Sequence, residues 1–278
     1  MRLRCIDMVA TAAVSLLLAS SGCGEGSGKL LLATTTSVRD SGLLDTLVPV
    51  FQERTGIEVQ VIAVGSGAAL RMGSEGNADV LLTHAPEGEQ ALVTSGAALS
   101  RKPFMENYFV IAGPAADPAG VGAAASAAQA YQRIAAAGAA YVSRGDDSGT
   151  HRREQALLRE AGLDAEGGWP GFARTGAGMG ITLQVAGERG AYVLSDLGTF
   201  LAFQQHTGLA ALSKPTPDLR NVYSVLRIDS ARFASGINAE GAQRFEDFLL
   251  APDTQQRIAE YGVERFGRPL FRPLLLRE

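Results

Sequence analysis

The sequence contains little cysteine, histidine or tryptophan. Its 278 residues include two cysteines, three histidines and one tryptophan. The three histidines are scattered, so no spacing typical of a metal site appears. Both cysteines, Cys5 and Cys23, lie near the N-terminus. The rest of the chain therefore offers no disulfide, no thiolate metal ligand and no cysteine nucleophile.

The chain also lacks an excess of positive charge. Its formal net charge at pH 7 is −4, from 25 basic and 29 acidic residues. If residues 1–22 are removed, Arg2, Arg4 and Asp7 are lost, and 23 basic and 28 acidic residues remain. Such a balance gives no general attraction for nucleic acid. Any anion that the protein binds must be held by local geometry.

No hydrophobic run is long enough to span a bilayer comfortably. The apolar segment 8–19 follows the basic residues Arg2 and Arg4, which is the pattern of an export signal. The signal ends at Ser20-Ser21-Gly22-Cys23, before a glycine-rich stretch. We therefore predict a lipoprotein signal peptide over 1–22, a flexible linker over 23–28 and lipidation at Cys23. The lipid would be the only membrane anchor, on the cell surface or in the periplasm; the alternative is a plain cleaved signal.

Short apolar runs alternate with amphipathic segments along the remaining chain. Residues 30–33, 57–64 and 78–83 have the composition of buried strands, and 43–54 carries its apolar residues at helical spacing. This alternation predicts an α/β fold with mainly parallel sheets flanked by helices. The loops that follow the strands then lie along one edge, where ligands bind in such folds.

The stretch from Ser143 to His151 runs from the end of a strand through a polar turn into a helix. Asp147 or Ser148 is the expected N-cap, and Gly149 leaves the free N–H groups of the first helical turn accessible. The helix dipole favours negative charge at this point, and Arg144 adds a cation. The turn is therefore a candidate anion site. The competing interpretation is a capped helix in which Arg144 forms an ion pair with Asp146 or Asp147.

Similar polar junctions recur along the chain, each with hydroxyl or small residues at the start of a helix. They are 34–37, 65–67, 148–150, 176–180 and 195–196. A hydrogen bond to a charged group contributes roughly 1.5–3 kcal/mol, so several neutral donors could replace the hydration shell of a small anion. The series favours convergence on one dehydrated anion over separate capping motifs.

Several of these motifs together resemble the periplasmic tungstate-binding proteins of ABC transporters. The resemblance spans residues 29 to about 270 and rests on motifs in a fixed order, with the Arg144 to Thr150 portion also similar to phosphate-binding proteins. These motifs are Thr34 to Ser37, Gly65 to Gly67, Asp79 to Pro86, Ser143 to His151 and Gly176 to Leu183. Leu197 departs from the pattern, because a polar or basic residue is expected after Asp196.

The resemblance implies a two-lobed, type II periplasmic-binding-protein fold with a ligand cleft between the lobes. Lobe 1 would comprise 29–110 and 226–278, and lobe 2 would comprise 111–225, with crossings near 109–113 and 223–226. It implies an oxyanion site that draws donors from both lobes: Thr36, Ser37, Ser66, Arg144, Ser148, Gly149, Thr150, Gly178 and Met179.

The function implied by the resemblance is high-affinity capture of tungstate, or else molybdate, outside the cytoplasm. The protein would be a monomer without a cofactor or a metal cation, and it would deliver the anion to the membrane permease of an ABC importer. Vanadate and phosphate are alternative ligands. A remote alternative is a hydrolase that uses Ser148, His151 and Asp147, but these residues lie too close together along one helix start to act as nucleophile, base and orienting group.

Overall fold

The computed structural model describes residues 28–233 and 236–276. The predicted signal peptide, Cys5, Cys23 and all of the predicted linker except Gly28 lie outside the described residues. Within the part that is described, no helix is both long and apolar enough to cross a bilayer.

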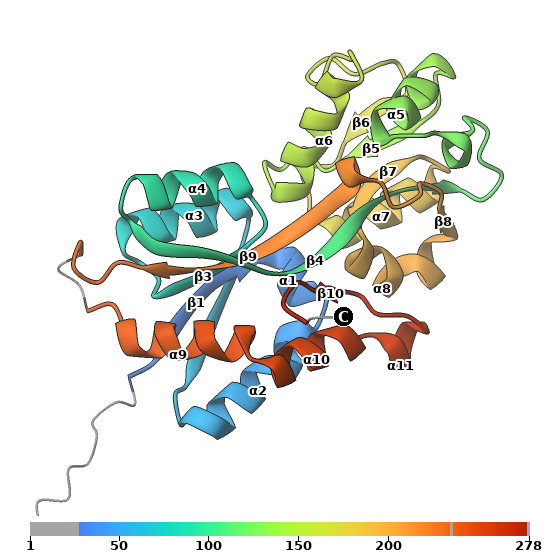
Figure 1. The fold of residues 1–278 in the computed structure, drawn as a ribbon. Helices are drawn as coiled ribbons and strands as arrows, with labels where there is room; N and C mark the ends of the chain where they lie inside the picture. Colours follow the sequence, from blue (N-terminus) through green and yellow to red (C-terminus); the bar gives the residue numbers. More distant parts are fainter. Residues whose placement is uncertain (1–27, 234–235, 277–278) are drawn as a thin grey trace, which may run out of the picture.

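The described chain folds into two lobes joined by long strands (Figure 1). The elements of lobe 1 are β1 (Leu30–Thr35), α1 (Thr36–Asp40), α2 (Leu43–Thr55), β2 (Val59–Val64), α3 (Ser66–Glu75), β3 (Val80–Thr83) and α4 (Pro86–Thr94), and after lobe 2 come β9 (Arg220–Ile228), α9 (Ala239–Leu250), α10 (Pro252–Glu260), α11 (Val263–Phe266) and β10 (Arg272–Pro273). The elements of lobe 2 are α5 (Ala127–Ala136), β5 (Tyr141–Ser143), α6 (Gly149–Glu160), β6 (Phe172–Arg174), α7 (Met179–Glu188), β7 (Val193–Asp196), α8 (Leu197–Thr207) and β8 (Leu209–Ala211). Strand β4 (Ala98–Pro114) runs through both lobes.

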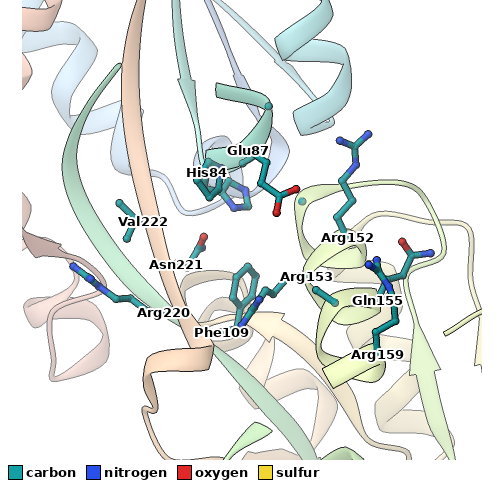
Figure 2. Close-up of a pocket in the computed structure, with 15 residues that line it drawn as sticks. His84, Glu87, Phe109, Arg152, Arg153, Gln155, Arg159, Arg220, Asn221 and Val222 are labelled. Carbon is teal, nitrogen blue, oxygen red and sulfur yellow. The ribbon is translucent and has the colours of Figure 1, made fainter. Parts of the chain in front are cut away.

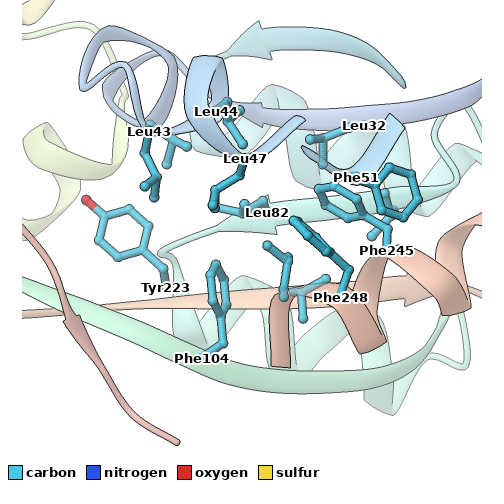
Figure 3. Close-up of a cluster of buried hydrophobic side chains, with 14 of the residues drawn as sticks. Leu32, Leu43, Leu44, Leu47, Phe51, Leu82, Phe104, Tyr223, Phe245 and Phe248 are labelled. Carbon is cyan, nitrogen blue, oxygen red and sulfur yellow. The ribbon is translucent and has the colours of Figure 1, made fainter. Parts of the chain in front are cut away.

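The sheet of lobe 1 has helices on both faces (Figure 1). Its strand order is β10-β4-β9-β3-β1-β2. Side chains alternate along the strands, so Tyr223 and Val225 of β9 face α2 and α9, whereas Leu226 and Ile228 face α3 and α4. Between α2 and α9, Phe51 packs edge-on against Phe245 with ring centroids 5.0 Å apart (Figure 3).

The predicted α/β class is confirmed, but the sheets are mixed rather than mainly parallel. β1 pairs in parallel with β2 and β3, and β5 pairs in parallel with β6. β9 pairs antiparallel with β3 and β4, and β4 pairs antiparallel with β7, β8 and β10. β4 and β9 pair antiparallel with each other because they carry the chain between the lobes in opposite directions.

Strand β4 is much longer than its apolar run from Tyr108 to Ala112 indicates. Its first half includes charged residues that pair with glutamates whose side chains are fully buried: Arg101 pairs with Glu89 at 2.7 Å and Lys102 with Glu246 at 2.8 Å. Pro103 interrupts the ladder at a register shift. Glutamates from outside the strand therefore stabilise the first half of β4, which the local sequence pattern does not indicate.

The pairing of β4 changes between Tyr108 and Phe109. Residues up to Tyr108 pair with β9 in lobe 1, and Phe109 begins the pairing with β7 in lobe 2. On the return path, Leu219 packs in the core of lobe 2 and Tyr223 in the core of lobe 1. We therefore propose that the crossings lie at Tyr108 to Phe109 and at Leu219 to Arg220, the second a few residues earlier than the position expected from the sequence.

A buried carboxyl group joins β5 to α6 in lobe 2. Glu154 accepts hydrogen bonds from the hydroxyls of Ser143 and Tyr141, the latter at 2.7 Å, and Tyr141 in turn lies 2.9 Å from the hydroxyl of Tyr131. Burial raises the pKa of Glu154 from 4.5 to about 7. This network holds the residue immediately before Arg144 against helix α6.

We expect Glu154 to make the stability of the protein depend on pH. Between about pH 4.5 and 7 the folded form retains the Glu154 proton that the unfolded form releases, so the free energy of unfolding falls as the pH rises. In Glu154→Gln this decrease, up to about 3 kcal/mol, should disappear. Denaturant unfolding at pH 5 and pH 8 measures it.

Glu160→Gln, at the exposed end of the same helix, is the matched control and should keep the wild-type dependence. Parallel pH profiles for the wild type and Glu154→Gln would show that the carboxyl group is not protonated in the folded protein.

Candidate functional site

Two helix starts meet at one edge of the lobe 1 sheet. β1 and β2 run in parallel with Thr35 opposite Val64, so the strands end side by side. Helix α1 begins directly after Thr35, whose side chain accepts a hydrogen bond from the backbone N–H of Val38 at 3.4 Å. Helix α3 begins after Gly65. The free N–H groups of both first turns therefore point to the same region.

A third helix start comes from lobe 2. Ser148 is the N-cap of α6, as predicted, and its hydroxyl accepts a hydrogen bond from the N–H of His151 at 3.3 Å. The preceding turn is tight, with positive φ at Gly145 and Asp147. This turn directs the start of α6 toward the starts of α1 and α3.

The three helix starts enclose a small cavity between the lobes. Its volume is about 10 Å³, comparable to the space that one water molecule needs. It is lined by Thr35, Thr36, Ser37, Val64, Gly65, Ser66, His84, Arg144, Ser148, Gly149 and Thr150.

Seven of the nine residues predicted for the site line this cavity: Thr36, Ser37, Ser66, Arg144, Ser148, Gly149 and Thr150. Gly178 and Met179 do not line it. Gly178 is exposed, and Met179 is buried in the core of lobe 2. Thr35, Val64, Gly65 and His84 were not predicted, although the first three belong to or adjoin the polar junctions and His84 directly follows strand β3.

Arg144 is buried and lines the cavity, and it also forms an ion pair. Its Nε and one terminal nitrogen donate to Asp146 Oδ2 at 3.1 and 2.5 Å. The salt bridge expected from the capped-helix interpretation is therefore present. A guanidinium group has five N–H donors, so it can hold a carboxylate on one edge and donate to a ligand on another.

Ser66 has a buried hydroxyl with no partner. Within residues 28–233 and 236–276, no hydrogen bond to its Oγ is formed, although this oxygen faces neighbours on the cavity wall. An unsatisfied buried polar group costs about 1–3 kcal/mol, and a ligand that accepts from Ser66 would remove this cost. The hydroxyl of Ser66 is therefore available to donate a hydrogen bond to a ligand.

Gly149 is a point of close approach between the lobes. A Cβ atom at this position would lie 2.7 Å from Ser66 Oγ and 2.8 Å from His84 Cε1. Both distances are shorter than van der Waals contact allows, so a side chain at position 149 would push the lobes apart. The backbone of α6 can approach lobe 1 because this residue has no side chain.

The imidazole of His84 is buried beside the cavity. Its Nε2 lies 3.3 Å from Ser37 Oγ, and its ring centroid lies 5.0 Å from that of Tyr223. Burial lowers the pKa of His84 from 6.5 to about 4, although the nearby carboxylate of Glu89 opposes the shift. The ring is therefore neutral at physiological pH and adds no charge to the site.

Asp196 does not line the cavity. It caps α8, accepting hydrogen bonds from Thr199 N at 2.9 Å and Thr199 Oγ1 at 2.8 Å. Burial raises its pKa, and the positive charge of Arg144 opposes this change. The structure thus gives Asp196 a capping role.

The charges around the cavity suit a small anion. Among its lining residues Arg144 is the one charged side chain, and no carboxylate is included. The remaining donors are hydroxyls and the N–H groups of helix starts, which favour negative charge. A carboxylate inside such a cavity would repel an anion. The lack of a carboxylate among the lining residues therefore favours anion binding.

A larger cleft of about 430 Å³ adjoins the cavity and shares His84 and Gly149 with it (Figure 2). Arginines predominate among its charged lining residues: Arg152, Arg153, Arg159 and Arg220, with one acidic residue, Glu87. Arg152 also pairs with Asp147 at 2.9 Å, and Arg153 donates to the backbone oxygen of Asp218. Arg153 and Arg220 also pair with Glu160 and Glu106, so carboxylates offset part of the positive charge of this cleft.

The arrangement does not form a hydrolytic triad. Ser148 Oγ accepts from the backbone of His151, and His151 Nδ1 accepts from the backbone N–H of Asp147 at 3.0 Å. Because Nδ1 of His151 already accepts this hydrogen bond, it is not positioned to take the proton of the Ser148 hydroxyl. In the described part of the chain, no group of three or more acidic, histidine or cysteine residues is placed to hold a metal ion.

Known proteins resemble this chain over most of its length. A profile of the PBP superfamily domain matches residues 19–253. The tungstate-binding protein TupA of Peptoclostridium acidaminophilum is 41% identical, with 95% of this chain and 96% of the relative covered.

Two solved structures share the fold. The tungstate-binding protein TupA from Desulfovibrio alaskensis G20 is 39% identical with a TM-score of 0.78, covering 88% of this chain and 98% of that one. The tungstate ABC transporter structure from Geobacter sulfurreducens is 39% identical with a TM-score of 0.75, covering 84% and 98%. The similarity therefore extends over both lobes.

Proposed function

The chain belongs to the PBP superfamily of periplasmic binding proteins, and from this premise we propose that it binds tungstate outside the cytoplasm for delivery to an ABC importer. The relatives named above are tungstate-binding proteins. The observation that best supports the same ligand here is the small cavity in which Arg144 and the unpartnered hydroxyl of Ser66 come together. The protein acts by binding and not by catalysis.

The donors around the cavity match a tetrahedral dianion. In this proposal, Thr36, Ser37 and Ser66 donate from lobe 1, and Arg144, Ser148, Gly149 and Thr150 donate from lobe 2. Each hydrogen bond to the charged oxygens contributes roughly 1.5–3 kcal/mol, which offsets the loss of hydration in a closed site. Gly178 and Met179, predicted from the resemblance, would join them only if α7 moved toward the cavity.

The absence of a lining carboxylate favours a fully deprotonated ligand. Phosphate carries a proton at neutral pH, and a site for it gains from an acceptor such as a carboxylate. Tungstate and molybdate carry no proton, so an all-donor cavity suits them better. These two anions have the same charge and nearly the same size, and vanadate also remains a candidate.

Binding requires the lobes to separate and close again. A cavity of about 10 Å³ has room for about one water molecule, whereas tungstate has four oxygens around a metal atom. The crossings at Tyr108 to Phe109 and at Leu219 to Arg220 are the natural hinges, because there the chain changes from one core to the other. Entry would proceed through the adjoining arginine-lined cleft.

The rest of the proposal concerns the cellular setting. The export pattern of the sequence supports a lipoprotein that is anchored at Cys23 after removal of residues 1–22. The mature protein would act as a monomer in the periplasm or at the cell surface and pass the anion to a membrane permease.

Calorimetry of the protein from residue 24 onward tests the proposal. We expect tight binding of tungstate, and weak or no binding of phosphate, whose proton would lack an acceptor in the cavity. Arg144→Ala should weaken tungstate binding by at least about tenfold, because it removes a charge-assisted hydrogen bond. Arg159→Ala, in the larger cleft, is the matched control and should bind nearly as tightly as the wild type.

If no tetrahedral oxyanion binds, the proposed function is wrong. A loss of affinity in Arg159→Ala that equals the loss in Arg144→Ala would move the ligand to the larger cleft. Circular dichroism of each variant checks that it is folded.

Gly149→Ala should block closure of the lobes over the anion. At the lobe separation in the structure, the added methyl group would lie 2.7 Å from Ser66 Oγ, and in the complex it would occupy space beside the anion, so we expect tungstate affinity to fall about tenfold or more. Gly65→Ala alters a glycine of the same cavity whose Cβ would have no neighbour within 4 Å. Calorimetry of the two variants separates the steric effect at Gly149 from the effect of losing a glycine. Equal tungstate affinities in Gly149→Ala and Gly65→Ala would refute closure at Gly149.

A further inference from the structure

Three side chains form a hydrogen-bonded chain along the lobe 1 wall of the cavity. His84 Nε2 lies 3.3 Å from Ser37 Oγ, and Ser37 Oγ lies 3.0 Å from Thr35 Oγ1. All three residues line the cavity. Either hydroxyl can be the donor in the second bond, so the direction of the chain depends on the proton of the imidazole.

The number of protons available for an anion follows from this direction. Ser37 and Thr35 have two hydroxyl protons between them, and the bond that joins them uses one. If His84 Nε2 carries a proton, it donates to Ser37, and the second hydroxyl proton is free to point into the cavity. If Nε2 is unprotonated, it accepts the Ser37 proton, and Thr35 must then donate to Ser37. The pair offers one donor in the first case and none in the second.

The surroundings of the ring hold it in place without fixing its proton. Its Cε1 lies where a side chain of Gly149 would be, and Tyr223 packs against its face. His84 Nδ1 forms no hydrogen bond within the described residues. Asn221 lies near the ring in the cleft (Figure 2), and hydrogen bonding to its side chain raises the pKa of His84 without assigning the proton to either nitrogen.

A bound oxyanion would decide between the two neutral forms. An anion against Thr35 and Ser37 needs a hydroxyl proton directed at it, and without one it would face oxygen lone pairs. Because the two neutral tautomers of imidazole differ little in intrinsic energy, one hydrogen bond to a charged oxygen is enough to select the tautomer that supplies it.

We propose that His84 is a positioning residue of the anion site: in the complex its Nε2–H donates to Ser37 and thereby frees one hydroxyl of the Ser37 and Thr35 pair to donate to the anion. This inference rests on the proposed oxyanion binding. It assigns His84 a role that needs no contact with the ligand and no positive charge.

Nitrogen NMR of the wild-type protein tests the tautomer directly. With ¹⁵N-labelled protein saturated with tungstate, two-bond ¹H–¹⁵N correlations distinguish a protonated from an unprotonated ring nitrogen. The chain has three histidines, and the spectrum of a His84 variant identifies the signals of this ring. We expect a protonated Nε2 and an unprotonated Nδ1; the opposite pattern, or protons on both nitrogens, overturns the proposal.

Two substitutions test the consequence for binding. In His84→Gln the side-chain amide can still donate to Ser37, whereas in His84→Met a chain of similar length cannot. We expect His84→Gln to bind tungstate within a few-fold of the wild type and His84→Met to bind about tenfold or more weakly. Equal affinities in two folded variants contradict the proposal.

The outcomes separate this inference from the proposed function. A wild type that binds tungstate with a proton on Nδ1 refutes the role of His84 alone. A wild type that binds no oxyanion refutes both. If neither variant folds, the tautomer measured in the wild-type complex decides.

Discussion

The contact of Gly149 with Ser66 and His84 is the constraint on which the site depends. It brings the start of α6 in lobe 2 against the start of α3 in lobe 1, and it does so at a residue without a side chain. Three helix starts thereby share one small cavity, and the hydroxyl of Ser66 is sealed from water without a partner among the described residues. The same contact closes the site and leaves a buried hydroxyl unsatisfied. A bound acceptor would remove the free-energy cost of that hydroxyl.

The small cavity has few charged groups on its wall. Arg144 is the one ionised group on the cavity wall, and Asp146 already balances part of it from outside. His84 stays neutral because burial lowers its pKa to about 4. A dianion is therefore held mainly by neutral dipoles, which favours ions that fit the donors over anions in general. The arginines of the adjoining cleft can attract anions without belonging to this selective site.

Much of the fold and part of the site follow from local patterns. Helix α2 begins at Leu43 and ends within one residue of the end that its apolar spacing predicts, and the junctions at Ser37, Ser66 and Ser148 are strand ends that precede helices. The first half of β4 is not evident from its own sequence, because its charged residues are paired with Glu89 and Glu246, which lie outside the strand. Which junctions converge depends on how the lobes face each other. No short segment carries that information, so Gly178 was grouped with the cavity residues and His84 was not.

Anomalous diffraction from a crystal of the protein with tungstate would locate the bound anion directly, because tungsten gives a strong anomalous signal. We expect a single strong peak between the lobes, with the oxygens of the anion within hydrogen-bonding distance of Ser66 Oγ, Gly149 N and the guanidinium of Arg144. A peak in the larger cleft near Arg159, or on the outer surface of either lobe, would contradict binding in the small cavity.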